Sequence, residues 1–458
     1  MKKLNYDIVY FIGVGGIGMS ALARWFNATG YGVFGYDKTP SELTETLEKE
    51  GIAIHYDDNV NKIPSDATKE NTLVIYTPAI PPDHKELGYF KTEGFTIKKR
   101  AEVLGDISRN YFTVAVAGTH GKTTTSSMIA HLLHFAGVDI TGFIGGIATN
   151  FNSNLVVGKT DKAIAVIEAD EFDRSFLHLS PNIAVVTSTD ADHLDIYGNG
   201  EELKNSFKSF IDKLEKDGEL LISQKANESL DLSFGSEYGL EASKIRAENI
   251  KIGEGVFVFN YVDENTKIEG LELSLPGFHN IENALAAIRI ALLLHIPAQK
   301  IKEGIKAYKG VKRRFEFIFK SATKVYIDDY AHHPEELNAF IKSVKALYPS
   351  KKLTVIFQPH LYSRTKDFST GFAKALDQAD QVWLLDIYPA RELPMEGVTS
   401  DLILSQMELK DKKLINKEAV IQEIKNSDFE ILATLGAGDI DRLVPEIKDV
   451  LQKMNAHA

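Results

Sequence analysis

The chain has 458 residues, of which 44% are hydrophobic and 25% are charged, and its formal net charge is −12. A chain of this length exceeds what one hydrophobic core supports, so we expect about three domains. The negative charge argues against a nucleic-acid or anionic-membrane partner, and the lack of cysteine excludes disulfides, thiolate metal sites and a cysteine nucleophile.

The first predicted element is a short apolar strand that ends in a glycine-rich turn at residues 13–18. A helix follows this turn, and the next strand closes with Asp37. Glycines at such a turn, with an acid about 20 residues further on, are typical of a dinucleotide-binding unit in which the turn holds a diphosphate. The same string also fits a tight turn of any parallel α/β unit, and NAD is only one ligand that it could bind. We expect a Rossmann-like domain over residues 1–108, with strands at residues 8–12, 32–36, 52–56 and 73–77.

A second glycine-containing turn follows the apolar run that begins at Val114, and it precedes a helix predicted over residues 122–135. Gly118 and Gly121 let the backbone approach an anion closely, and the free N–H groups of the turn and the helix point toward that anion. The helix dipole adds to the attraction. We therefore predict that this turn binds phosphate.

The residues after this turn suit a nucleotide site. Lys122 can reach the outer phosphates, and the hydroxyl of Thr123 can hold Mg²⁺. The spacing departs from that of the usual P-loop, because Val116 stands where its first glycine would be. An ordinary strand-turn-helix junction is the alternative. We expect a P-loop ATPase-like central domain over residues 109–312.

Two buried-type strands of this domain are predicted at residues 163–168 and 183–187, and polar residues follow each of them. Ligands of an open α/β sheet bind outside the carboxyl ends of the strands, so these residues would face the same crevice as the phosphate-binding turn. Mg²⁺ prefers carboxylate and hydroxyl oxygens, with an occasional histidine. We therefore predict that Glu168 and His193 bind a metal ion, with turn capping as the alternative. The neighbouring acids are expected to support these ligands or to cap turns: Asp170, Glu171, Asp173, Asp192 and Asp195.

A charged amphipathic helix is predicted over residues 201–217. The stretch from residue 219 to residue 275 favours β-strands that extend the sheet or pack on it. A turn then leads into a strong helix that carries Asn280 and Asn283 on one face. These two amides could cap the helix, or they could contact a base or a ribose.

The third predicted domain covers residues 313–458, in which strands and helices alternate in a Rossmann-like pattern. Arg313 and Arg314 stand at its start, where fixed positive charge could stabilise a transferring phosphoryl group. A solvated basic turn is the alternative for this pair. His332 and His333 follow one strand directly, and capping of the next helix does not explain two adjacent imidazoles.

Together, these motifs resemble those of the Mur ligase family, the ATP-dependent amide-bond enzymes of peptidoglycan precursor synthesis. They occur in the order expected for that family and cover all three predicted domains. The string from Ile12 to Ser20 further resembles that of the alanine-adding member. The motifs are Gly118-Thr-His-Gly-Lys-Thr-Thr, Glu168-Ala-Asp-Glu, Asp192-His193, His279-Asn280-Ile-Glu-Asn283, Arg313-Arg314-Phe-Glu and Asp328-Asp-Tyr-Ala-His-His-Pro.

The resemblance implies an ATP- and Mg²⁺-dependent ligase that joins the lactyl carboxylate of UDP-N-acetylmuramate to L-alanine through an acyl phosphate. It implies that the first domain holds the UDP-sugar, that the central domain holds MgATP, and that the third domain closes over the site with the amino acid. Each of these roles is carried over to the matching positions of this chain.

The implied contacts with the UDP-sugar are Gly13, Gly15, Gly16, Ile17, Gly18, Met19 and Ser20. The implied ATP-binding residues are Gly118, Thr119, His120, Gly121, Lys122, Thr123, Thr124, Asn280, Asn283, Arg314 and Asp328. In this set, Asn280 and Asn283 would meet the adenine and Asp328 the ribose. The implied metal ligands are Thr123, Glu168 and His193, and His332 and Arg364 would help to place L-alanine. The implied catalytic residues are Lys122, Glu168, His193 and Arg314.

The chain departs from the family pattern at several positions. Family members typically carry His-Arg-Tyr where this chain has His360-Leu361-Tyr362, so one expected anion contact is absent. Ala331 stands where glycine is usual. Later ligases of the pathway use a carbamylated lysine after the Asp-His motif. When this chain is matched to them from that motif onward, Phe207 stands at the position of the lysine, so we expect no carbamylated lysine.

Three other functions fit parts of the sequence. The chain could be a recycling ligase that attaches a preformed tripeptide to the same sugar, an NAD-dependent oxidoreductase, or a nucleotide-sensing module without turnover. The expected partners are small-molecule substrates, and neither nucleic acid nor membrane. No run of about 18 apolar residues occurs, so we expect a cytoplasmic protein. We also expect a monomer or a weak homodimer.

Overall fold

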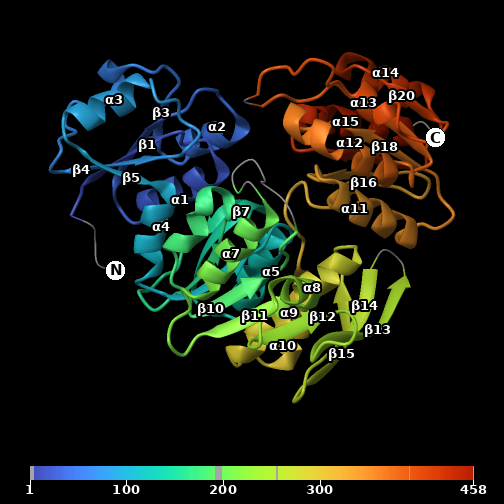
Figure 1. The fold of residues 1–458 in the computed structure, drawn as a ribbon, viewed down its shortest axis with the longest axis horizontal. Helices are drawn as coiled ribbons and strands as arrows, with labels where there is room; N and C mark the ends of the chain where they lie inside the picture. Colours follow the sequence, from blue (N-terminus) through green and yellow to red (C-terminus); the bar gives the residue numbers. More distant parts are fainter. Residues whose placement is uncertain (1–4, 191–196, 198, 254–255, 391, 457–458) are drawn as a thin grey trace. The chain divides into compact units, whose positions relative to one another are not determined.

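The computed structural model describes residues 5–190, 197, 199–253, 256–390 and 392–456. Over these residues the chain builds three α/β sheets, of five, ten and six strands in chain order (Figure 1). The first two sheets belong to a compact unit that ends at Lys309, and the third sheet belongs to a second unit that begins at Gly310; two short segments, 249–259 and 272–281, cluster with the second unit. The predicted fold class, a chain of α/β domains built on largely parallel sheets, is confirmed.

The first sheet is parallel, with the strand order β3-β2-β1-β4-β5. Every residue of β1 is buried, because Val9 and Phe11 enter one core while Tyr10 and Ile12 enter another on the opposite face. A strand covered on both faces needs apolar side chains throughout, as the sequence shows. The elements are β1 (Ile8–Ile12), α1 (Ile17–Ala28), β2 (Gly32–Tyr36), α2 (Glu42–Lys49), β3 (Ala53–His55), β4 (Thr72–Tyr76), α3 (Lys85–Thr92), β5 (Thr96–Lys99) and α4 (Arg100–Ser108).

The second sheet has the strand order β15-β14-β13-β12-β11-β10-β6-β9-β7-β8. Its part from β12 to β7 is parallel, and β8 pairs antiparallel with β7. Its strands are β6 (Phe112–Ala117), β7 (Ile140–Ala148), β8 (Ser153–Val156), β9 (Ile164–Glu168), β10 (Ile183–Val186), β11 (Glu219–Ser223), β12 (Ser236–Gly239), β13 (Ile245–Gly253), β14 (Val256–Val262) and β15 (Lys267–Leu273).

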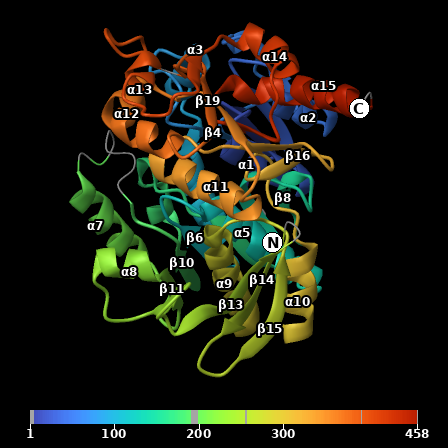
Figure 2. The same cartoon turned by 90° about the vertical axis from the view of Figure 1, so that its right-hand side faces the viewer.

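The helices of this part are α5 (Lys122–Phe135), α7 (Gly200–Ile211), α8 (Gln224–Leu230), α9 (Phe278–Leu293) and α10 (Ala298–Ala307). Helix α5 has the predicted bounds and is buried along most of its length, and α10 packs beside it (Figure 2). The prediction of one helix over residues 201–217 is wrong at its end, because α7 stops at Ile211. The charged residues that follow continue no apolar face, and the chain turns there into β11.

The third sheet has the strand order β16-β17-β21-β18-β19-β20, and only its edge strand β16 is antiparallel. Its strands are β16 (Glu316–Lys320), β17 (Val325–Asp329), β18 (Leu353–Phe357), β19 (Gln381–Leu384), β20 (Lys412–Leu414) and β21 (Ile431–Leu435). Its helices are α11 (Pro334–Leu347), α12 (Tyr362–Leu376), α13 (Asp401–Leu404), α14 (Lys417–Asn426) and α15 (Val444–Ala456).

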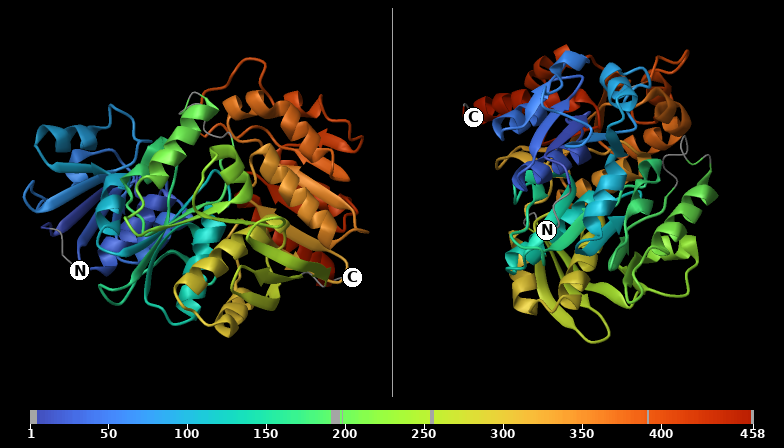
Figure 3. Two further views of the ribbon diagram at one scale, coloured as in Figure 1. Left: turned by 60° about the horizontal axis from the view of Figure 1, so that its bottom comes forward. Right: turned by 90° about the vertical axis from the view of Figure 1, so that its left-hand side faces the viewer.

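One hydrophobic core joins the first two sheets. Helix α1 packs on the β7–β8 hairpin (Figure 3). The rings of Trp25 and Phe143 lie 6.5 Å apart at this contact. The side chain of Asn154 donates hydrogen bonds to the carbonyl of Ile17 at 2.6 Å and to the hydroxyl of Ser20 at 2.9 Å, so a buried polar contact fixes the same interface. In the described part of the chain no helix is long and apolar enough to cross a bilayer.

Candidate active site

The phosphate-binding turn predicted between β6 and α5 forms as expected. Gly118 has a φ angle of 141° and Gly121 one of 82°, a region that favours glycine. A Cβ atom on Gly118 would lie 2.0 Å from Thr187 Oγ1 and 2.8 Å from the backbone nitrogen of Ser188. Glycine is therefore required at this position, because the end of β10 passes directly against the turn.

The end of β10 also holds the turn through hydrogen bonds. The backbone N–H of His120 donates to Ser188 Oγ at 2.7 Å, and the hydroxyls of Thr119 and Ser188 share a hydrogen bond at 2.9 Å. Thr187 Oγ1 donates to the carbonyl of His120. The loop is thus ordered by its neighbouring strand, which pre-organises its backbone for an anion.

Lys122, the first residue of α5, directs its ammonium back into the turn. Its Nζ lies 2.7 Å from Glu171 Oε2 and 2.6 Å from the carbonyl oxygen of Gly118. Burial alone would lower the pKa of Lys122, but the carboxylates of Glu171, Asp170 and Glu168 raise it overall, so the side chain is charged. A charged ammonium therefore lies in the predicted phosphate site.

Glu168, at the carboxyl end of β9, meets the same turn. Thr123 Oγ1 donates to Glu168 Oε1 at 3.0 Å, and the backbone N–H of Gly145 on β7 donates to Oε2 at 2.8 Å. Burial raises the pKa of Glu168, while the charge of Lys122 and the N–H of Gly145 oppose that rise. The structure thus brings together two of the three predicted metal ligands.

These two ligands fit a hard divalent cation. A carboxylate and a hydroxyl in contact, beside a turn that would hold phosphate oxygens, form the donor set that Mg²⁺ prefers. The third predicted ligand, His193, lies outside the described residues, as do Asp192 and Asp195. Within the described ranges, three or more histidine, aspartate or glutamate side chains do not gather at any point where they could hold a metal ion.

Gly145 is a site residue that the sequence did not reveal. A Cβ atom built on it would lie 2.2 Å from Glu168 Oε1, so glycine leaves the space that this carboxylate occupies. The only signal in the sequence is a Gly-Gly pair within an otherwise apolar strand, which often marks a close approach of another group.

The two predicted amides are both buried and engaged. Asn283 Oδ1 accepts a hydrogen bond from Thr125 Oγ1 at 3.0 Å, which links α9 to α5 next to the turn. The side chain of Asn280 donates to the carbonyl of Pro276 at 2.6 Å, a local contact at the start of α9 that differs from capping, in which a side chain accepts a backbone N–H. Contacts of the pair with adenine stay a prediction.

The glycine-rich turn of the first domain is closed by the acid that follows β2. Gly13 has a φ angle of 87°, and the backbone N–H of Gly15 donates to Asp37 Oδ2 at 2.7 Å. The side chains of Met19 and Ser20 are buried in the core, so a substrate could meet these two positions only through their backbone.

Arg100 is a second residue that the sequence did not reveal. A Cβ atom on Gly18 would lie 2.9 Å from its Nη1, so its guanidinium lies beside the predicted UDP-sugar turn. Its Nη2 also lies 3.6 Å from Asp170 Oδ2 of the central domain. A fixed guanidinium next to a glycine-rich turn is suited to a diphosphate.

In the second unit, the two arginines predicted at its start take different roles. Arg313 pairs with the buried carboxylate of Asp328 at 3.2 Å and donates to the carbonyl of Gly436 at 2.6 Å. Arg314 lies over the ring of Tyr330 at 5.1 Å, with its Nη1 3.6 Å from Glu336 Oε1. Arg313 therefore holds the fold together, while the contact of Arg314 with the Glu336 carboxylate places its guanidinium at the start of α11.

The loop after β17 is ordered by two carboxylates. Asp329 accepts backbone N–H groups of Phe315 at 2.6 Å and Ala331 at 2.7 Å, and burial raises its pKa to about 7. Glu336 accepts the backbone N–H of His332 at 2.9 Å and lies 3.2 Å from the Nδ1 of that residue. The position of the His332 ring is thus determined by the first turn of α11.

Arg364 lies in the first turn of α12, where a positive charge is unfavourable for the helix dipole and would be stabilised by an anion. Leu361, which departs from the family pattern, precedes that helix with a φ angle of 68°. Positive φ angles also occur at Arg313 and Phe315 in the same unit. Such strained residues cluster at ligand-binding sites. Their positions agree with a site at the end of the third sheet where β17 and β18 finish.

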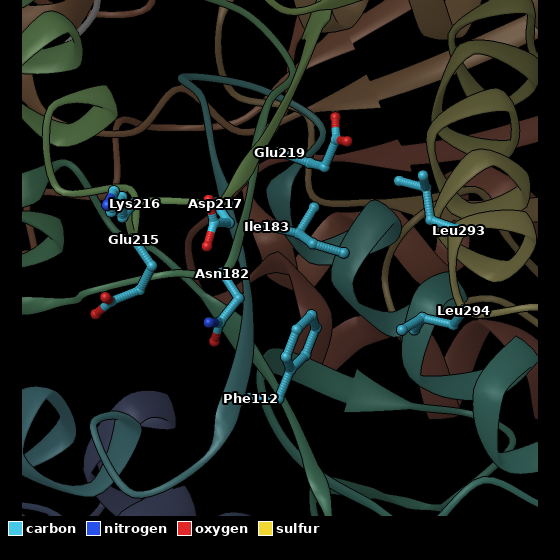
Figure 4. Close-up of a pocket in the computed structure, with 9 residues that line it drawn as sticks. All are labelled: Phe112, Asn182, Ile183, Glu215, Lys216, Asp217, Glu219, Leu293 and Leu294. Carbon is cyan, nitrogen blue, oxygen red and sulfur yellow. The ribbon is translucent and has the colours of Figure 1, made fainter.

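Phe207, which we expect at the position of the carbamylated lysine of later ligases, is fully buried and packs against Phe176. A separate open pocket of about 500 Å³ lies at the opposite end of the central sheet, where Leu293 at the end of α9 and the next residue, Leu294, lie across from Phe112 and Ile183 (Figure 4). It contains none of the predicted site residues.

Three family descriptions match consecutive parts of the chain: "Mur ligase family, catalytic domain" at residues 8–112, "Mur ligase middle domain" at residues 116–291 and "Mur ligase, glutamate ligase domain" at residues 313–440. The chain belongs to the Mur ligase family, as its motifs predicted.

The UDP-N-acetylmuramate–L-alanine ligase of Flavobacterium psychrophilum is 52% identical over 97% of this chain and 98% of its own length. The enzyme of the same name from Cytophaga hutchinsonii is 45% identical over 98% and 97%. Among solved structures, the UDP-N-acetylmuramate–alanine ligase of Thermotoga maritima has a TM-score of 0.82 and 28% identity, over 97% of this chain and 99% of that one. A murein peptide ligase from Psychrobacter arcticus has a TM-score of 0.69 and 22% identity, over 97% and 98%, and shares the fold.

Proposed function

We propose that the chain uses ATP to join the lactyl carboxylate of UDP-N-acetylmuramate to L-alanine. The observation that carries this proposal is the arrangement of Lys122, Thr123 and Glu168 around one phosphate-binding turn. Full-length identity to relatives named for this reaction supports the choice of both substrates. We further propose that the enzyme works in the cytoplasm, where both nucleotides are available.

The reaction has two steps. An oxygen of the lactyl carboxylate attacks the γ-phosphorus of ATP, the bond from that phosphorus to the β–γ bridging oxygen breaks, and ADP leaves. The alanine amine then attacks the acyl carbon, the bond from that carbon to the phosphate oxygen breaks, and the amine loses a proton. The protein mainly has to bring two anions together and reduce their repulsion.

The residues of the central domain suit the first step. In this proposal Lys122 contacts the β- and γ-phosphates, and the backbone N–H groups of Gly121 and of the first turn of α5, residues 122–124, hold the phosphate chain, because the N–H groups of Thr119 and His120 already bond to Ser188. Thr123, Glu168 and His193 would hold Mg²⁺, which supplies positive charge to the phosphate oxygens when bound. Asn280 and Asn283 would meet the adenine.

The other two domains would bind the UDP-sugar and alanine, and the third domain would also contribute the guanidinium of Arg314. The first domain, residues 1–108, would hold the UDP-sugar at its glycine-rich turn with Arg100. The central domain would cover residues 109–312, and the third, residues 313–458, would contribute Arg314 to the γ-phosphate and Asp328 to the ribose. His332 and Arg364 would place the alanine.

The test is phosphate release with UDP-N-acetylmuramate, ATP and a panel of amino acids, in which L-alanine should stimulate release most. No stimulation by L-alanine would reject the proposal. A preformed tripeptide in competition with alanine tests the recycling reaction. Binding of NADH, read from its fluorescence, tests the oxidoreductase.

A further inference from the structure

Glu171 is a buried acid whose role the reaction described above leaves open. Its side chain is 0% exposed, and both of its carboxylate oxygens reach the ammonium of Lys122, at 2.7 Å from Oε2 and 3.0 Å from Oε1. A fully buried carboxylate is rare and is costly unless it is paired. A pair of this kind beside a ligand site therefore requires a reason.

The pair determines where the charge of Lys122 lies. The ammonium also donates to the carbonyl oxygens of Gly118 at 2.6 Å and Thr119 at 3.4 Å, so its hydrogen-bonding groups are turned into the phosphate-binding turn. A lysine side chain is flexible, and carbonyl oxygens alone attract an ammonium less strongly than a carboxylate does. Glu171 is the partner that restricts the ammonium to this position.

The loop that carries Glu171 is itself fixed. The hydroxyl of Tyr197 donates to the carbonyl oxygen of Glu171 at 2.5 Å, and the next turn contains Asp173 and Arg174 with φ angles of 53° and 54°. Two left-handed residues in succession are unfavourable outside glycine and persist only where the surroundings impose them.

The first domain holds the other side of this loop. Lys99 Nζ lies 3.2 Å from Asp173 Oδ2, and Arg100 Nη2 lies 3.6 Å from Asp170 Oδ2. The carboxylate of Glu171 is thus presented by a backbone that is held from both sides. Its neighbour three residues earlier, Glu168, points to Thr123, so the two glutamates of this loop have separate partners.

We propose that Glu171 is a positioning residue for Lys122, which directs the ammonium toward the phosphates throughout phosphoryl transfer. This inference rests on the role of Lys122 in the function proposed above. The negative charge of Glu171 also opposes the binding of an anionic nucleotide. Its net effect should therefore be a slightly weaker complex with ATP and a faster reaction within that complex.

The test replaces Glu171 by its neutral isostere, Glu171→Gln, and compares kcat with the affinity for MgATP. Turnover should fall at least about tenfold, because the ammonium loses the charge that directs it. The dissociation constant for ATP should stay the same or become smaller. Glu171→Asp keeps the negative charge on a shorter side chain, so its turnover should be higher than that of Glu171→Gln. If Glu171→Gln does not fold, the same measurements are made on Glu171→Asp and compared with the wild type.

Glu202→Gln is the matched control, since Glu202 is an exposed glutamate that contacts Arg174 at 3.8 Å and should tolerate the same change. Turnover of Glu171→Gln within about twofold of the wild type would overturn the proposal. The proposal would also be overturned if weaker ATP binding explained the whole decrease in turnover and the melting temperature fell as well. These two results together would indicate that Glu171 has only a structural role.

A second measurement does not depend on the reaction. The rate at which acetic anhydride acetylates Lys122, relative to the exposed Lys213 of the same sample, should rise at least about threefold in Glu171→Gln because the ammonium is released from its partner. An unchanged relative rate would overturn the positioning role. Phosphate release by the wild type without alanine dependence would instead reject the proposed function, and the labelling result would still stand.

Discussion

The backbone N–H of Gly145 on β7 donates a hydrogen bond of 2.8 Å to the carboxylate of Glu168 at the end of the neighbouring strand β9. A methyl group at Gly145 would lie 2.2 Å from Glu168 Oε1. The carboxylate is the flexible end of its side chain, so the protein should still fold while Glu168 moves away. Gly145→Ala should lower turnover at least about tenfold and raise the Mg²⁺ concentration needed for half-maximal rate.

Gly142→Ala is the control for this change, because the added methyl group on the same strand meets its neighbours at an ordinary 3.6 Å. Its turnover and its Mg²⁺ dependence should match those of the wild type. A normal Mg²⁺ dependence in Gly145→Ala would show that Glu168 is not a metal ligand.

Lys122→Ala should abolish measurable turnover while leaving the affinity for the UDP-sugar largely intact. The ammonium lies in the turn after β6, whereas the predicted UDP-sugar turn lies in the first sheet. Calorimetry with UDP-N-acetylmuramate provides the measurement. A comparable loss of sugar affinity would contradict the assignment of the two nucleotides to separate domains.

Arg314→Ala should lower kcat by about a hundredfold and weaken ATP binding much less, because a guanidinium aimed at the transferring phosphoryl group acts most in the transition state. Arg313→Ala provides the contrast. It leaves the carboxylate of Asp328, which is 1% exposed, without its arginine, so it should lower the melting temperature as well. An effect of Arg314→Ala that lies entirely in ATP affinity would refute the transition-state role.

The buried carboxyl group of Glu86 in the first domain should make stability depend on pH. Burial raises its pKa from 4.5 to about 7, against the opposing hydrogen bonds from Tyr10 and from the N–H of Asn59. The folded state therefore binds this proton more tightly than the unfolded state does. The resulting contribution to stability is present below pH 4.5 and is lost as pH rises through about 7, by roughly 3 kcal/mol.

Glu86→Gln isolates this effect, because an amide can still accept the hydrogen bond from Tyr10 but does not titrate. Melting temperatures of both proteins from pH 5 to pH 8.5 provide the comparison. The variant should gain stability relative to the wild type as pH rises. His55 and His84, whose pKa values are lowered by burial, act in the opposite direction and are common to both proteins. A difference that does not change with pH would contradict the raised pKa of Glu86.

Much of the fold could be predicted from the sequence because its central strands are buried on both faces and read as unbroken apolar runs. Strands β1, β6 and β9 were found in this way, and α5 was found from the turn before it. The β7–β8 hairpin was missed, because the glycines that bring its backbone close to Glu168 also interrupt its apolar pattern.

The candidate site was only partly predictable, for a related reason. Lys122, Thr123 and Glu168 follow strand ends, where the topology itself brings side chains together. Gly145 and Arg100 act through proximity to another segment, and the local sequence signals this only for Gly145, through its Gly-Gly pair. Glu171 was expected only to support ligands or cap a turn, since its pairing with Lys122 depends on the backbone of the following loop.

The core shared by α1 and the β7–β8 hairpin bears on how members of this family could recombine. Trp25, Phe143 and Leu155 belong to a single cluster, so a chimaera joined near residue 108 would set a foreign helix against a native hairpin. The junction between Lys309 and Gly310 instead falls between two compact units. An exchange of amino-acid specificity should therefore succeed by grafting the part that begins at Gly310, provided that segments 249–259 and 272–281, which cluster with the same unit, are matched to it. A graft of the first sheet alone would have to carry the hairpin with it.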